Sequence, residues 1–107
     1  MTNPKLETFR QMVARQPGNA LARFGLANEA MKAGLHEEAR VHLEVYLANH
    51  DDEGNGFGRL ADALLGLGRT AEARAVLARG IAASLRFGHP SMAAEFEARV
   101  EELEEGG

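Results

Sequence analysis

The sequence predicts an all-α fold in which antiparallel helix pairs stack into a solenoid. The first observation is a repeat, because eight residues recur 34 positions further along the chain. They are Leu26 and Leu60, Ala27 and Ala61, Gly34 and Gly68, Glu38 and Glu72, Ala39 and Ala73, Arg40 and Arg74, Leu43 and Leu77, and Ala48 and Ala82. The second is composition: 6% of the residues are aromatic and none is Trp, which suits close packing of helices on Leu and Ala. A unit of this period cannot bury its apolar side alone, so we expect a binding surface rather than a catalytic centre.

Length and composition indicate one small domain. The chain has 107 residues, of which 45% are hydrophobic and 26% charged, enough for a single modest core. It has no cysteine, which excludes disulfides, thiolate zinc sites and cysteine nucleophiles. The formal net charge of -4 argues against nucleic acid as the main partner. No stretch has the pattern of a signal peptide or a membrane span, so we expect a cytoplasmic protein with no membrane partner.

A first helix is predicted over residues 4–15. Asn3 can cap it, and Pro4 suits the first helical position because the N–H that proline lacks would have no partner there. The apolar residues that recur at helical spacing are Leu6, Phe9 and Val13. Pro17 and Gly18 then end the pattern, since both favour turns.

A second and a third helix follow and form the first full pair. Asn19 can cap the second helix, whose apolar residues occupy more than one side, as expected of a helix with several neighbours. Gly34 ends it, because glycine adopts the left-handed conformation at little cost. The third helix carries one apolar stripe, and the polar stretch that starts at Asn49 closes it. The stripe consists of Ala39, Leu43, Tyr46 and Leu47.

A second pair repeats this plan, with several glycines at its start. The fourth helix ends at Gly68, and Thr70 can cap the fifth. Gly54, Gly56 and Gly58 would each cost a helix about 1 kcal/mol relative to alanine. They therefore predict a frayed or late-starting first turn of the fourth helix. The alternative is that another helix approaches closely at these glycines.

A sixth helix is predicted after a break at residues 88–90. Its apolar stripe consists of Met92, Phe96, Val100 and Leu103. Its other positions are rich in glutamate, which is typical of the capping helix of a solenoid. The predicted organisation is one domain over residues 1–107, with an N-terminal half repeat at 4–18, a first repeat at 19–53, a second repeat at 54–87 and a capping helix at 88–105.

The repeats resemble those of the tetratricopeptide family. That family has a large residue, Leu with a small residue, Gly at the helix turn, Ala early in the second helix and a bulky residue four positions later. The first copy reads Phe24, Leu26, Ala27, Gly34, Ala39 and Leu43, and the second reads Phe57, Leu60, Ala61, Gly68, Ala73 and Leu77. The small residues let two helix axes approach while the large ones fill the remaining space. The resemblance covers residues 20–87, and Arg23 departs from it by standing where the family often has a large aromatic residue.

The resemblance implies a right-handed superhelix of about six helices with a concave groove that binds peptides or proteins. On the matching positions, the partner-binding residues are Leu21, Phe24, Asn28, Met31, Lys32, Asn55, Asp62 and Leu65. Members that bind chaperone tails hold a terminal carboxylate with lysines and asparagines. Phe24 stands here in place of such a lysine and Asp62 in place of an asparagine, so we do not expect that ligand. If Met92 and Phe96 pack into the groove it is already occupied, whereas packing on the preceding helix leaves it open.

Other chemistry finds little support in the sequence. His36 and His42 lie six residues apart, which is not the same-face spacing of two helical metal ligands, so we expect the four histidines to be solvated. The run from His50 to Glu53 is the most metal-like, but Asp52 acting as a helix N-cap explains it. The glycine-rich residues 54–58 lack the lysine of a phosphate-binding loop, and neither serine lies in a nucleophile motif. We therefore expect no enzymatic activity, metal or cofactor.

The function we expect is non-catalytic binding of a peptide or protein segment in the groove. Apolar side chains would contact the ligand, while Asn28, Lys32 and Asp62 would orient it through hydrogen bonds and charge. A structural role is the alternative. Because two repeats bury little core, the apolar groove or the ends of the stack could pair two copies into a homodimer.

Overall fold

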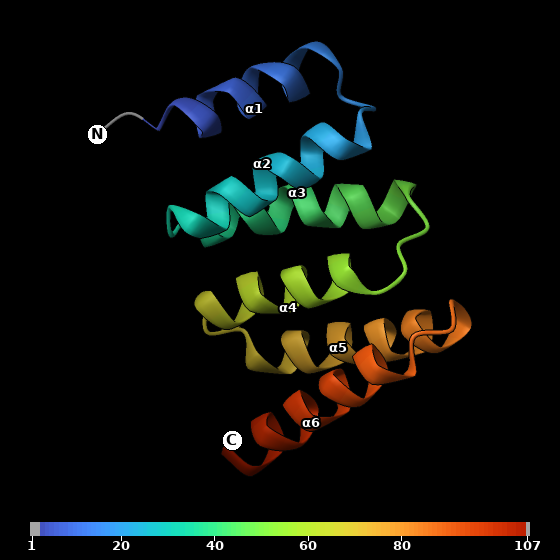
Figure 1. Cartoon of the computed structure of the whole chain (residues 1–107). Coiled ribbons are helices and arrows are strands. Elements are labelled where there is room, and N and C mark those ends of the chain that lie inside the picture. The colour runs from blue at the N-terminus through green and yellow to red at the C-terminus, as the bar shows by residue number, and fades with distance from the viewer. Residues whose placement is uncertain (1–2, 107) are drawn as a thin grey trace.

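The computed structural model describes residues 3–106, and this part of the chain is all-helical, with six α-helices and no strand. The helices are α1 (Pro4–Arg15), α2 (Ala20–Lys32), α3 (His36–Asn49), α4 (Asn55–Gly66), α5 (Thr70–Arg86) and α6 (Pro90–Gly106). Each packs against the next in chain order and runs antiparallel to it, so that α1 and α6 lie at opposite ends (Figure 1). No helix of the described residues is both long and apolar enough to cross a membrane. The predicted all-α fold is confirmed.

Helix ends follow local sequence in most places. The Asn3 side chain accepts a hydrogen bond from the first turn of α1 at 3.1 Å, and Asn19 does the same for α2 at 3.0 Å. Both predicted caps are therefore confirmed. Thr70 is not a cap, because α5 begins at Thr70 itself and Arg69 precedes it without a capping side chain. The N–H of Arg69 instead donates to the Leu64 carbonyl oxygen at 2.8 Å and closes the turn after α4.

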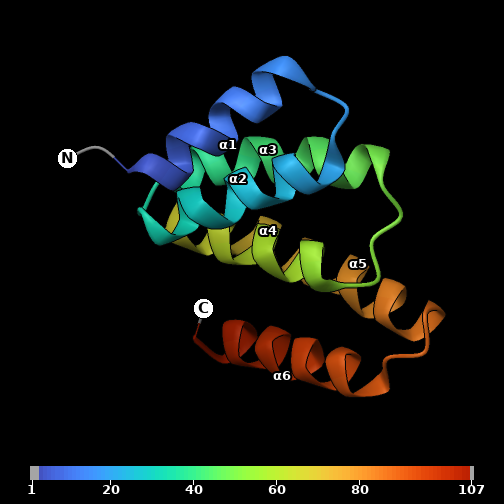
Figure 2. The same cartoon turned by 45° about the horizontal axis from the view of Figure 1, so that its top comes forward.

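The two helix pairs use their recurring residues in the same way. Gly34 and Gly68 turn the chain at nearly equal positive φ, 76° and 75°. The recurring core residues are each at most 2% exposed; they are Leu26 and Leu60, Ala27 and Ala61, Ala39 and Ala73, and Leu43 and Leu77. One apolar cluster runs from Leu6 in α1 to Phe96 in α6, so a single core joins all six helices. The start of α1 and the end of α6 lie on the same side of this stack (Figure 2).

The glycines at the start of α4 are places of close approach, and the predicted late start of this helix is wrong. Gly56 and Gly58 are helical and buried. A Cβ at Gly56 would lie 3.0 Å from side-chain atoms of Tyr46 and Leu47. A Cβ at Gly58 would lie 3.1 Å from the ring of Phe96. Packing against these neighbours offsets the low helix propensity of glycine, which is about 1 kcal/mol per residue.

Candidate functional site

The residues predicted to contact a partner lie on α2 and α4, the first helices of the two pairs. Five of them are polar or exposed, and their spacing places them on the same side of their helix. We call these five residues the α2/α4 face; they are Leu21, Asn28, Lys32, Asn55 and Asp62. Leu21 is 83% exposed, more than any other large hydrophobic residue in residues 3–106. Lys32 is also exposed, and its ammonium lies 3.1 Å from the Glu29 carboxylate of its own helix.

The other three predicted residues are apolar and serve the packing of the helices. Phe24, Met31 and Leu65 are half-buried and contact the core cluster. The ring centroid of Phe24 lies 4.9 Å from that of Tyr46 on α3, in a tilted arrangement that is favourable for aromatic pairs. Leu21 is therefore the one predicted apolar residue that offers most of its side chain to a ligand.

Helix α6 packs on α5 and also reaches α4. Phe96 is 6% exposed and its ring lies against Gly58 of α4 and Gly80 of α5. One turn further along α6, the Arg99 guanidinium donates to the Asp62 carboxylate at 2.5 Å. A hollow of about 230 Å³ remains between α4 and α6 beside this ion pair. The carboxylate of Asp62 is thus already paired, while the α2 side of the face is not covered by α6.

In the second helix pair, the ring of Phe96 from α6 occupies the space that corresponds to two aromatic rings in the first pair. Phe24 and Tyr46 stand 34 positions before Gly58 and Gly80. In the first pair the two rings contact each other, whereas a Cβ at Gly80 would lie 3.0 Å from the ring of Phe96. The second pair therefore has a glycine notch where the first has aromatic side chains. Because α6 fills that notch, it is part of the core and not a loose appendage.

Asp52 organises the connection between α3 and α4. Its side chain is 8% exposed and accepts hydrogen bonds from the Tyr46 hydroxyl at 2.8 Å and from the N–H groups of Gly54 and Gly56 at 2.8 and 2.7 Å. Asp52 is not the predicted N-cap, because Gly54 is the residue that flanks α4, but its carboxylate still accepts from the N–H of Gly54 and from that of Gly56 in the first turn. Burial and the hydrogen bond to Asp52 both raise the pKa of Tyr46 above its usual value, so this phenol is neutral at any physiological pH.

The two acidic residues that flank Asp52 in the α3–α4 loop bind basic residues around the α5–α6 loop. Asp51 accepts from Arg86 at 2.5 Å, and Glu53 lies 2.6 Å from the His89 ring nitrogen. In residues 3–106 no group of three or more His, Asp or Glu side chains is placed to hold a metal ion. These pairs connect the α3–α4 loop to the end of α5 and the start of α6.

Three of the four histidines, His36, His42 and His89, are half-buried and so differ from the expectation that all four are solvated. His36 is half-buried at the start of α3, where its ring lies against Gly66 of α4. His42 is half-buried on α3, and its Nδ1 lies 3.0 Å from the guanidinium of Arg23. Burial, and secondarily the charge of Arg23, lower the pKa of His42, so it is neutral at pH 7. The Nδ1 atom is then the acceptor and Nε2 carries the proton.

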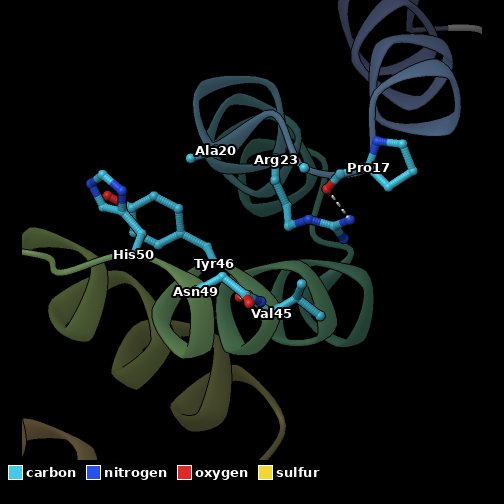
Figure 3. A pocket seen from close by; sticks show the side chains of 8 residues that line it. Pro17, Ala20, Arg23, Val45, Tyr46, Asn49 and His50 are labelled. Carbon is cyan, nitrogen blue, oxygen red and sulfur yellow. Dashed lines mark hydrogen bonds between the residues drawn. The ribbon is translucent and has the colours of Figure 1, made fainter.

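A second hollow lies beside Arg23, and its lining contains none of the residues of the α2/α4 face. It is bounded by the α1–α2 connection, the first turn of α2 and the last turns of α3 (Figure 3). Its volume is about 280 Å³. Sequence reasoning noted Arg23 only as a departure from a repeat pattern. An arginine at a position where an aromatic residue is usual was the available signal.

Comparison with models of known protein families gave no match, and comparison with curated proteins gave no similar sequence.

Proposed function

We propose that the chain is a tetratricopeptide-like repeat module that binds an extended peptide or protein segment on the α2/α4 face without catalysing a reaction. The observation that carries this proposal is the 83% exposure of Leu21 at the start of that face. A leucine side chain gains about 1.5–3 kcal/mol on burial, so its exposure favours a partner that covers it. The equal burial of residues 34 positions apart supports the repeat assignment.

Two amides would orient the ligand. The side chains of Asn28 and Asn55 make no hydrogen bond with another residue in the described part of the chain. Each amide can donate to a peptide carbonyl and accept from a peptide N–H. Lys32 and Asp62 are both in ion pairs, with Glu29 and Arg99 respectively, and therefore contribute less than the two amides. We therefore expect ligands to contact α2 more than the part of α4 beside α6.

The proposal is tested by selecting peptides from a random library on the immobilised protein and measuring their affinity by calorimetry. Leu21→Ser should weaken a selected peptide about tenfold or more, because burial of the leucine is lost. Leu85→Ser is the matched control: Leu85 is 55% exposed but lies at the end of α5. Equal affinity for wild type and Leu21→Ser would refute binding at this face.

Pairing of two copies is a second candidate, and one observation favours it. Leu85 and Phe87 are 55% and 37% exposed where α5 ends, so two large apolar side chains are exposed at this end of the helix. A second copy could cover them. Light scattering over a wide concentration range decides this point. A dimer that Leu85→Ser dissociates would support self-association, and a monomer at every concentration would exclude it.

A further inference from the structure

The hollow beside Arg23 combines apolar walls with one cation. Val45 and the ring of Tyr46 form one side, and Pro17 lies opposite (Figure 3). The ring of His50 lies 4.9 Å from that of Tyr46 and extends the aromatic wall. Pockets that hold small molecules are mostly apolar with a few polar groups, and the volume of about 280 Å³ is close to the lower end of their range. None of the residues of the α2/α4 face lines this hollow.

The charge of Arg23 is not neutralised by the protein. Its guanidinium donates to the Pro17 carbonyl oxygen at 2.8 Å and to His42 Nδ1 at 3.0 Å, and both acceptors are uncharged. Among residues 3–106, no carboxylate lies within ion-pair distance of Arg23. A guanidinium has five N–H donors, so three remain after these two bonds, including one on each terminal nitrogen.

Two other hollows on the described residues contain an arginine that is paired with a carboxylate of the same hollow. The hollow between α4 and α6 contains Asp62 together with Arg99, and the one beside α1 contains Glu7 together with Arg10. The Arg23 hollow has no carboxylate in its lining, although the chain as a whole carries a formal charge of -4. It is thus a place where an anion would gain a charged partner without displacing one of the protein's own carboxylates.

We propose that the Arg23 hollow binds a small organic carboxylate with an aromatic or apolar body. The free N–H groups of Arg23 hold the carboxylate, because guanidinium and carboxylate form charge-assisted hydrogen bonds of matching geometry. The apolar body lies against Val45 and the ring of Tyr46, where it is removed from water. The volume of about 280 Å³ is sufficient for one six-membered ring with its acid group.

The test compares benzoate with benzamide on the wild-type protein by following backbone amide shifts in NMR spectra. The two molecules have nearly the same shape, and only benzoate is charged. We expect benzoate to shift the amides of Ala20 and Val45 in a saturable way, with a Kd in the millimolar range. Benzamide should bind about tenfold more weakly or not at all, since it lacks the charge-assisted bonds. Equal affinities, or shifts that do not saturate, would overturn the proposal.

Two variants locate the charge. Arg23→Gln should weaken benzoate about tenfold, whereas Arg15→Gln removes an exposed cation that does not line the hollow and should leave the Kd unchanged. If both variants bind like wild type, the site is not at Arg23. Should Arg23→Gln fail to fold, the comparison of benzoate with benzamide still decides the matter. An acetylated and amidated Phe-Glu dipeptide identifies the source: tighter binding than benzoate indicates a peptide carboxylate, and weaker binding indicates a free acid.

Discussion

Replacement of Gly54 by alanine should destabilise the fold by about 2–6 kcal/mol. The φ of Gly54 is 142°, a conformation that L side chains rarely adopt and that costs them about 1–3 kcal/mol. A Cβ there would lie 2.5 Å from Met92 Sδ and 2.6 Å from Ser84 Oγ. The methionine can move, but Ser84 is fully buried and donates to the Gly80 carbonyl oxygen at 2.7 Å. The resulting overpacking reduces the free energy of unfolding by about a further 1–3 kcal/mol.

Gly34→Ala is the control that separates backbone strain from packing. Gly34 also has a positive φ, 76°, but no atom lies within 4 Å of the position of its Cβ. The control should therefore cost only about 1–2 kcal/mol. The assay is urea denaturation followed by circular dichroism and fitted to a two-state transition. If Gly54→Ala is no more destabilising than Gly34→Ala, then α4, α5 and α6 do not meet at Gly54 as tightly as the structure indicates.

Three further predictions use the same assay or simple variants of it. Asp52→Ala should reduce the free energy of unfolding by about 2–4 kcal/mol, because three hydrogen-bond donors lose their acceptor. The control Asp51→Ala removes an exposed ion pair and should reduce it by less than about 1 kcal/mol. Similar losses for both variants would refute the role of Asp52 as the acceptor for the start of α4. Phe96→Ala should cost about 3–5 kcal/mol because it empties the glycine notch, and a loss below about 1 kcal/mol would show that α6 is not docked there. Hydrogen bonds from Arg10 hold the pKa of Glu38 below its usual 4.5, so this contribution to stability is present above that value and disappears as the pH falls through the lower folded-state pKa. Arg10→Gln should therefore reduce the difference in Tm between pH 7 and pH 3, and an unchanged difference would contradict the assignment.

Local signals predicted the helices because their causes are local. Asn3 and Asn19 accept from residues three positions ahead, and Gly34 turns the chain within its own neighbourhood. Such interactions are written in consecutive residues. The recurrence after 34 residues also predicted how the helices pair, and the recurring core residues are indeed buried to the same degree. The predictions from sequence failed where a residue contacts a partner that is distant in the chain.

Gly58 shows why the rest was not accessible from the sequence. Its helix propensity is poor, so local reasoning predicted a frayed turn. The ring that fills the space beside it belongs to Phe96, 38 positions later, and only the folded structure brings the two together. The pairing of Asp62 with Arg99 was missed for the same reason. Propensity describes an isolated segment, whereas tertiary packing decides its final conformation.

The candidate sites divide in a similar way. Leu21 was predicted from its position in the repeat, and the structure leaves it largely exposed. Phe24 was predicted from the same pattern, but its ring is used in packing against Tyr46. The Arg23 hollow depends on the α1–α2 connection meeting the end of α3, a juxtaposition that residue spacing does not reveal. Exposure and cavity shape are properties of the assembled helices rather than of any one of them.

The measurement that tests the central claim most directly is an NMR map of a selected peptide on the protein. Backbone amides would be assigned, and the shifts that saturate with peptide would be placed on the structure. The proposal predicts that they centre on Leu21, Asn28 and Asn55, on the α2/α4 face. Shifts confined to Val41 on α3 and Leu85 on α5, which are 41% and 55% exposed, would contradict it and assign recognition to other surfaces of the stack.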